Sequence, residues 1–286
     1  MNITERYNNG ATLNELAKSE KTSVYFIRKE LNFNNAITRK PSESILLKSK
    51  DFNHDDYLND VLIGELLGDG CIIPVGKSKH TGIFSYTTKH KKYIEWLYGI
   101  LASYDIDIYG NNIAENKIFP RDNFTAKTTN ISYKARTKSY VHFGEMYKMW
   151  YPNGKKIVPN SFIITPTVLL HWYLGDGSLS TDKANSGRGK WTYIYKNVRL
   201  HTNGFSYEQN LMLADKLKNI GLNFRVVKHT SNFKGNKVIN WQLLLPKPTI
   251  NNHIFFSFLP PCPDEIKEIY GYKWEWETTK IPRKII

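Results

Sequence analysis

Two short sequences, LLGDG at residues 66–70 and YLGDG at residues 173–177, each place an aspartate between two glycines at the end of an apolar run. Glycine often ends a helix and Asp-Gly favours a turn, so one copy would indicate no more than a helix end. Two copies, each at the end of an apolar run, are much stronger evidence that the sequence is more than a helix end. Carboxylates are ligands of divalent cations such as Mg²⁺, and such a cation activates water and stabilises a leaving oxygen. Asp69 and Asp176 are therefore the first candidate catalytic and metal-binding residues.

The residues before each aspartate predict a helix that carries it. Residues 55–68 have acids in the first turn and then apolar residues on a wide face. Residues 165–175 begin with Thr-Pro, a good cap followed by proline at the first helical position. Both segments are apolar nearly all round, so we expect both helices to be largely buried.

The chain repeats the same kinds of segment after each aspartate. Strand-like segments with alternating apolar and polar residues are IFSYTT and NISYKAR in the first half, and WTYIYKNVRLHT, FRVVKHT and VINWQLLL in the second. One more helical segment follows in each half, at residues 90–104 and 207–221. Each half is therefore expected to be α+β with a mostly antiparallel sheet.

A lysine occurs at a similar distance after each aspartate. Lys138 lies in RTKSYV and Lys247 in LPKPTI, and each precedes an apolar stretch and then a proline. The match supports an internal duplication. The alternative is that each is one surface lysine among many.

The composition favours a polyanionic partner. The 286 residues include 40 Lys and Arg against 26 Asp and Glu, a net charge of +14 that is spread along the chain. On a folded protein such an excess favours nucleic acid, although an inert basic surface is the alternative. Cys71 and Cys262 are too few for a four-thiolate metal site and are typical of a reducing compartment. No signal peptide and no apolar run of about 20 residues is present, so we expect an intracellular, non-secreted protein without a membrane partner.

The first residues predict a small helical unit. Thr12 and Glu15 form a capping-box pattern, and Val24, Ile27 and Leu31 form an apolar stripe at helical spacing. This stretch resembles the helix-turn-helix of resolvases and small repressors. Its second helix would expose residues that can bond phosphates and base edges: Ser23, Tyr25, Arg28 and Lys29. The alternative is a helical hairpin that packs on the main body.

The two aspartate-bearing segments resemble the LAGLIDADG motif, in the forms LIGELLGDG at residues 62–70 and LLHWYLGDG at residues 169–177. The chain is similar to single-chain, intron-encoded LAGLIDADG homing endonucleases over about residues 55–286. The resemblance implies a pseudo-symmetric duplicated α+β fold, in which two saddle-shaped sheets surround a central helix pair and sit in the DNA major groove. We expect a helix-turn-helix extension at residues 1–45, a linker, a first half at 55–160 and a second half at 161–286.

In the resembling family, the paired helices bring one acid from each half together beneath the DNA. Two close carboxylates resist ionisation, and a divalent cation, expected to be Mg²⁺, resolves the repulsion. A basic residue from each half also lies near the cleaved phosphates, and this role would fall to Lys138 and Lys247. One departure concerns the third motif position, which is Gly64 in the first half and His171 in the second. The histidine puts close helix packing at that level in doubt.

The leading hypothesis is a monomeric, metal-dependent endonuclease that cuts both strands of a specific DNA site. Basic residues of the predicted strands and turns are candidate DNA contacts: Lys134, Arg136, Lys190, Lys196, Arg199, Arg225, Lys228, Lys234 and Lys237. One alternative is a maturase that binds the RNA of its own intron. Another is a transcription regulator on a cleavage-dead fold, which the presence of both acids disfavours.

Overall fold

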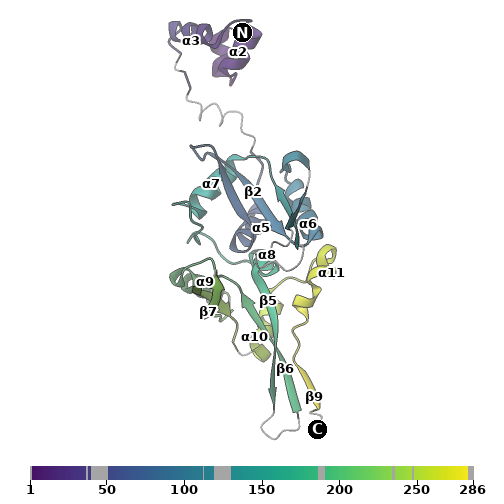
Figure 1. Cartoon of the computed structure of the whole chain (residues 1–286). Helices are drawn as coiled ribbons and strands as arrows, with labels where there is room; N and C mark the ends of the chain where they lie inside the picture. The colour runs from purple at the N-terminus through teal and green to yellow at the C-terminus, as the bar shows by residue number, and fades with distance from the viewer. Residues whose placement is uncertain are drawn as a thin grey trace.

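The structure is a computed structural model, and it describes residues 2–36, 38–39, 51–111, 113–118, 130–185, 191–233, 236–246 and 248–282. Figure 1 shows a group of short helices at the N-terminus and two larger halves of helices and strands that follow each other along the chain. Most of the predicted linker after residue 45 lies outside the described residues. Within the described part, no helix is long and apolar enough to cross a membrane.

The N-terminal unit contains three short helices, α1 (Ile3–Asn8), α2 (Leu13–Ser19) and α3 (Val24–Phe33). Thr12 and Glu15 form the expected capping box at the start of α2. Ile27 and Leu31 are buried against residues of α1 and α2 in a cluster separate from the main core. The unit therefore has its own small core, as the apolar stripe predicts.

The first half consists of the motif helix followed by the strands of one sheet and by further helices. Its elements are α5 (Asp56–Leu67), β1 (Cys71–Val75), β2 (Thr81–Thr88), α6 (Lys91–Ala102), η1 (Tyr109–Asn111), β3 (Ala114–Ile118), β4 (Asn130–Arg136) and α7 (Val141–Trp150).

The second half repeats this order and adds a C-terminal segment. Its elements are α8 (Pro166–Asp176), β5 (Gly177–Asn185), β6 (Trp191–Leu200), α9 (Tyr207–Asn219), β7 (Arg225–Phe233), β8 (Asn236–Leu244), α10 (Pro248–Phe258), η2 (Asp264–Ile266), α11 (Lys267–Tyr270), η3 (Gly271–Trp274) and β9 (Thr279–Pro282).

The two sheets have the same topology. The strand orders are β1-β2-β4-β3 and β5-β6-β8-β7, all antiparallel, and β9 adds to β6. Registers also correspond, because Cys71 pairs with Ser85 on β2 as Ser178 pairs with Arg199 on β6. The predicted duplicated α+β fold is confirmed. The sequence analysis missed β1, β3, β5 and β9, which are short, edge-located or rich in polar residues, and it missed helices α7 and α10.

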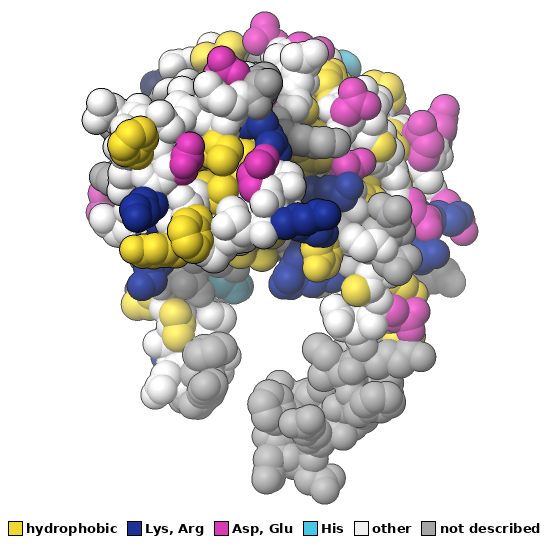
Figure 2. Space-filling model, turned by 90° about the horizontal axis from the view of Figure 1, so that it is seen from above, with side chains coloured by type: hydrophobic (Ala, Val, Ile, Leu, Met, Phe, Trp, Pro, Cys, Tyr) yellow, Lys and Arg dark blue, Asp and Glu magenta, His cyan; other side chains and the backbone are white. Residues whose placement is uncertain are grey.

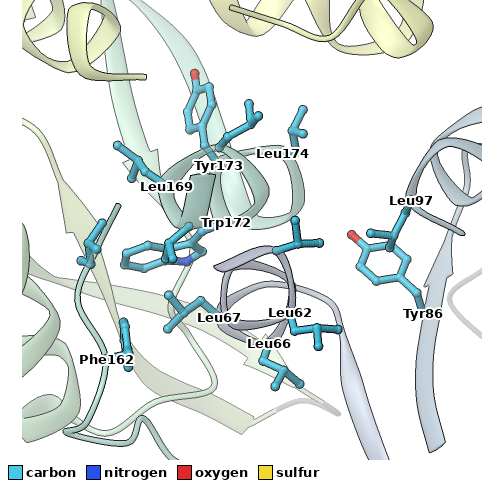
Figure 3. Packing of buried hydrophobic residues seen from close by; sticks show 14 of the residues in the cluster. Leu62, Leu66, Leu67, Tyr86, Leu97, Phe162, Leu169, Trp172, Tyr173 and Leu174 are labelled. Atoms are coloured by element: carbon cyan, nitrogen blue, oxygen red, sulfur yellow. The ribbon is translucent and has the colours of Figure 1, made fainter. Parts of the chain in front are cut away.

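The motif helices α5 and α8 pack against each other at the centre of the molecule. Each begins at a side-chain cap: Asp55 accepts a hydrogen bond from the Leu58 N–H, and Thr165 accepts one from the Val168 N–H. Figure 3 shows Trp172 and Leu67 lying together between the two helices, whereas Tyr173 projects from α8 away from α5. Both helices are thus enclosed by one continuous core, as their apolar surfaces predict.

Candidate active site and nucleic-acid interface

Glycines allow the two motif helices to approach closely at the end that carries the acids. A β-carbon at Gly68 would lie 3.5 Å from the Gly175 α-carbon, and one at Gly175 would lie 3.4 Å from the Asp69 backbone nitrogen. Backbones this close bring the residues that follow, Asp69 and Asp176, to the same level of the helix pair. The predicted pairing of one acid from each half is therefore present in the structure.

The two acids share an electrostatic environment but not an equal one. Asp69 is the more exposed of the two residues, although protein atoms surround much of its carboxyl group, and Asp176 is half-buried. Burial raises the pKa of the Asp176 carboxyl to about 7; the nearby charge of Asp69 adds to the rise, and Lys156 and Lys273 oppose it. Burial also raises the pKa of Asp69, again opposed by the two lysines. The pair thus resists carrying two negative charges unless cations are close.

Two lysines that the sequence analysis did not select lie beside the acids. Lys156 Nζ donates hydrogen bonds to the carbonyl oxygens of Gly68 (3.1 Å) and Gly70 (2.8 Å). Lys273 Nζ donates to the carbonyl oxygens of Tyr173 (3.1 Å) and Leu174 (2.8 Å). Each ammonium group therefore binds carbonyl groups at the C-terminal end of the motif helix in its own half, where the helix dipole favours a cation.

Burial gives both lysines an unusual acidity. It lowers the pKa of Lys156 and that of Lys273 to about 8, while the nearby carboxylates of Asp69 and Asp176 raise both values. A lysine whose pKa is near neutrality can stabilise a phosphate oxygen or exchange a proton with water. One signal could have identified Lys273: it is the cationic residue inside the aromatic run YGYKWEW at residues 270–276, where burial is expected.

The structure places Lys138 away from this site. Its ammonium group bonds Asp107 Oδ2 at 2.8 Å, and both side chains are about half exposed. Ser132 of β4 borders the hollow beside Asp69, whereas Lys138 follows β4, which ends at Arg136. The strand between Ser132 and Arg136 alone spans about 13 Å. The prediction rested on the similar number of residues between each aspartate and its lysine. It took no account of the direction in which the chain runs after Ser132, which is away from Asp69. Lys247, its predicted counterpart, lies outside the described residues.

A hollow beside Asp69 provides access to the acids. It is lined by Thr87, Thr88, Lys89, His90 and Ser132 as well as Asp69. All but the acid come from the end of β2, the turn after it and β4. Hydroxyl and basic groups of this kind can bind phosphate oxygens and ordered water.

The corresponding surface of the second half contains a hydrogen-bonded histidine. His201 Nε2 is 2.7 Å from Ser178 Oγ, and its Nδ1 is 3.0 Å from Gln242 Nε2. The backbone N–H of His201 donates to the Asp176 carbonyl oxygen. By sheet register, Thr87 and Lys134 of the first half correspond to His201 and Gln242. The polar groups around the two acids have therefore diverged.

We use the term saddle face for the side of each sheet opposite the core-facing residues. Lys134 and Arg136 flank the buried Ala135 on β4, so their side chains lie on the saddle face. Arg199 lies between the buried Val198 and Leu200 and therefore has the same orientation in the second half. Figure 2 shows several Lys and Arg side chains close together near the centre of this view of the molecule.

The other predicted DNA contacts divide by register. Arg225 pairs with Leu244, which also pairs with Arg199, so Arg225 lies on the saddle face. Strand alternation places three further residues on the opposite face, away from the expected DNA: Lys196, Lys228 and Lys237. The amino-acid types alone do not show how the strands pair, so the sequence could not distinguish basic residues on the saddle face from those on the opposite face. Lys190 and Lys234 lie outside the described residues.

In the N-terminal unit, Ser23 caps α3 by accepting a hydrogen bond from the Phe26 N–H at 3.4 Å. Tyr25, Arg28 and Lys29 are exposed on the same helix, as the sequence predicts. The exposed aromatic ring and two cationic groups form a surface that can meet nucleic acid.

Comparison with known proteins tests the family resemblance. The chain is 28% identical over 236 residues to the uncharacterized protein MJ1098 of Methanocaldococcus jannaschii, covering 78% of each chain. It is 29% identical over 158 residues to the cytochrome b mRNA maturase bI2 of Debaryomyces hansenii, covering 54% of this chain and 53% of that protein.

Among solved structures, the homing endonuclease I-WcaI bound to its DNA recognition sequence has the same fold, with a TM-score of 0.58 and 20% identity. The match covers 85% of this chain and 97% of that one. At the level of sequence families, residues 59–239 match the LAGLIDADG DNA endonuclease family. Because this match spans more than half of the chain and includes both motif helices, the chain belongs to the LAGLIDADG DNA endonuclease family.

Proposed function

We propose that the protein is a site-specific endonuclease that cuts both strands of a DNA duplex, with one strand cut beside each acid. The observation that carries this proposal is the meeting of Asp69 and Asp176, each with its own buried lysine, at the end of the central helix pair. Such a site offers two sets of an acid and a lysine side by side, one from each half. A duplex has two scissile phosphates, so the number of sites suits the substrate.

The donor atoms fit divalent cations that are bound together with the substrate. Among the described residues, no group of three or more His, Cys, Asp and Glu side chains could hold a metal by itself. The two carboxylates with raised pKa values therefore need further oxygen ligands, and phosphate and water supply them in typical Mg²⁺ sites. When bound, Mg²⁺ would activate water and stabilise the leaving oxygen.

The protein's own groups perform the remaining steps. Asp69 and Asp176 would hold the cations at the level of the DNA backbone. Gly70 and Gly177 serve the packing beneath them, because a β-carbon at Gly70 would lie 2.7 Å from the Glu65 carbonyl oxygen and one at Gly177 would collide with Tyr173. We assign to Lys156 and Lys273 the role first expected of Lys138 and Lys247, which is to stabilise negative charge on the cleaved phosphate. Lys134, Arg136, Arg199 and Arg225 would bind the duplex from the saddle face, and the N-terminal unit would extend the contact through Tyr25, Arg28 and Lys29.

The direct test is digestion of a randomised duplex library with Mg²⁺, followed by sequencing of the cut ends. We expect a single recurrent site with breaks on both strands, and no breaks with an Asp69→Asn, Asp176→Asn double variant. Absence of cutting on every target with the wild-type protein would overturn the proposal.

A maturase is the second candidate function, because one relative is described as a maturase and shares 29% identity over 158 residues. The same basic surfaces would then also bind intron RNA. Splicing of the host intron, with and without the purified protein, tests this activity separately, since the acids should be dispensable for it.

A further inference from the structure

A buried polar contact crosses the interface between the two motif helices. His171 Nδ1 of α8 lies 2.6 Å from Glu65 Oε1 of α5, and the two side chains are 1% and 0% exposed. A carboxylate oxygen only accepts hydrogen bonds, so the proton lies on Nδ1 of His171. Neither residue borders the hollow beside Asp69, so the contact lies outside the proposed chemistry.

The pair is difficult to explain as a source of stability. Oε2 of Glu65 has no hydrogen-bond partner among the described residues, which leaves part of a buried carboxylate unsatisfied. Buried ion pairs often contribute less to stability than apolar side chains of the same volume. The best-attested benefit of a buried polar pair is that it selects one alignment of the packed elements.

Of the polar contacts between the described parts of the motif helices, the Glu65–His171 pair is the one near the acids. Another lies near the N-terminal ends of the helices, where the Thr165 hydroxyl donates to Asp60 Oδ2 at 2.7 Å. Around Glu65 and His171 the contact consists of glycines and apolar side chains such as Leu67 and Trp172, which give no directional bond.

A slip of α8 by one residue would move Asp176 by about 1.5 Å relative to Asp69. Glu65 lies in the last turn of α5, just before Gly68 ends the helix, and its carbonyl oxygen accepts a hydrogen bond from the Gly70 N–H at 2.8 Å. A bond at Glu65 therefore also fixes the level of Asp69, which lies between these two glycines.

Both partners also contact residues of α6. Tyr93 of α6 donates its hydroxyl hydrogen to Glu65 Oε1 at 2.6 Å. The Trp96 ring stacks on the His171 ring, with centroids 5.1 Å apart and planes within 11°. Gly64 provides the space, because a β-carbon there would lie 2.6 Å from the His171 β-carbon. The histidine at the third motif position is therefore fitted against the glycine of the other half.

We propose that Glu65 and His171 are a positioning pair that fixes the register of α8 on α5 and so sets the two metal-binding aspartates at one level. The catalytic consequence rests on the proposed endonuclease function, while the structural consequence does not. The pair acts through Asp69 and Asp176 and touches neither substrate nor cation.

The test compares His171→Leu with Tyr93→Phe. Both remove a 2.6 Å hydrogen bond to the same Glu65 oxygen, but only the first removes a bond between halves. Under single-turnover conditions with saturating enzyme, we expect His171→Leu to cut its DNA site about 10- to 100-fold more slowly, as for a misplacement near 1 Å. DNA affinity measured with Ca²⁺ should change less than about threefold, since the basic saddle face is intact. Tyr93→Phe should lower the unfolding temperature and leave the cleavage rate near that of the wild type.

If His171→Leu does not fold, a second pair of variants tests the same proposal. His171→Asn places an amide nitrogen near the Nδ1 position and should keep the wild-type rate, whereas His171→Gln places it near Nε2 and should be slow. Equal rates for these two, or equal slowing by His171→Leu and Tyr93→Phe, would overturn the proposal. If the wild-type protein cuts no DNA, the function is wrong but the register remains testable. Crystal structures should then show α8 displaced along α5 in His171→Gln and not in His171→Asn, and identical levels of the aspartates would refute the pair's role.

Discussion

The two halves build the same site from corresponding elements, yet the sites are not equal. In each half an aspartate ends the motif helix, and a lysine from a later segment binds carbonyl oxygens at that helix end. Lys156 arrives in the connection between α7 and α8, whereas Lys273 arrives in η3, well after α10. The lysine thus reaches the same place by two different routes through the chain.

Each site has an aspartate and a lysine, but the residues that surround these charged groups differ between the halves. Lys273 is 4% exposed and Lys156 is half-buried, while Asp176 is the more buried acid. The surface beside Asp176 has the Ser178, His201 and Gln242 network, where the first half has Cys71, Thr87 and Lys134 in register. Duplication has therefore kept the charged groups and changed their polar surroundings. Two unequal sites should cut the two strands at unequal rates.

The largest effect should come from the acids, which are common to both halves. Asp69→Asn or Asp176→Asn should reduce double-strand cutting by at least about 10³-fold, because each variant loses a ligand of the proposed cations. DNA binding with Ca²⁺ should persist. Cleavage of supercoiled plasmid carrying the target site measures this, and normal double-strand cutting by either variant would show that the paired acids are not the catalytic centre.

The lysines test whether each half serves its own strand. Lys156→Met and Lys273→Met should each slow cutting by about 10²-fold, the usual loss for one electrostatic stabiliser. If each lysine serves one strand, nicked plasmid should accumulate, and strand-specific labels should show opposite strand preferences in the two variants.

Lys138→Met is the matched control for the lysine variants, because Lys138 is exposed and paired with Asp107. It should cut both strands at close to the wild-type rate. Strong slowing by Lys138→Met, with little effect of the other two, would restore the assignment made from sequence spacing.

These lysines also show where sequence reasoning reaches its limit. The motif helices, the acids and the duplicated α+β halves could be predicted, because caps, apolar periodicity and a repeated Gly-Asp-Gly are local signals. Lys156 and Lys273 could not be matched to each other, because they follow their acids through segments of different length and structure. Their role depends on their being close to the aspartates in the folded protein, and the number of residues between them along the chain does not predict this.

Strand register set a second limit. Lys196 and Arg199 lie three residues apart on β6, and the amino-acid sequence alone presents both as basic strand residues. The buried positions of Val198 and Leu200 place Arg199 on the saddle face and Lys196 on the other, where it donates to Thr181 Oγ1 at 3.1 Å. For His171, the sequence showed a departure from the motif but not the Gly64 pocket that receives it.

The N-terminal unit sharpens the comparison because only the first half carries it. Deleting residues 1–45 should weaken DNA affinity by about tenfold at moderate salt and flatten its salt dependence by about one unit for each lost phosphate contact. The main core is separate from this unit, so the cutting rate at saturating enzyme should be unchanged. Footprinting should show the loss at one end of the site. An unchanged affinity across a salt series would mean that this unit does not bind DNA.

The smallest expected effect concerns stability, and it follows from the greater burial of Asp176. Burial raises the pKa of this carboxyl from 3.8 to about 7 in the folded protein, so the folded state binds more protons than the unfolded state between these values. The free energy of unfolding therefore falls as the pH rises from about 4 through 7. Asp176→Asn removes this loss and should unfold about 2–4 °C above the wild type at pH 8 in metal-free buffer, with no such gain at pH 4. Asp69→Asn should gain less, because Asp69 is the more exposed of the two residues. Thermal unfolding followed by circular dichroism at both pH values measures the difference. If Asp176→Asn is less stable than the wild type at pH 8, or if the gain is the same at both pH values, then the folded protein does not raise the pKa of the Asp176 carboxyl.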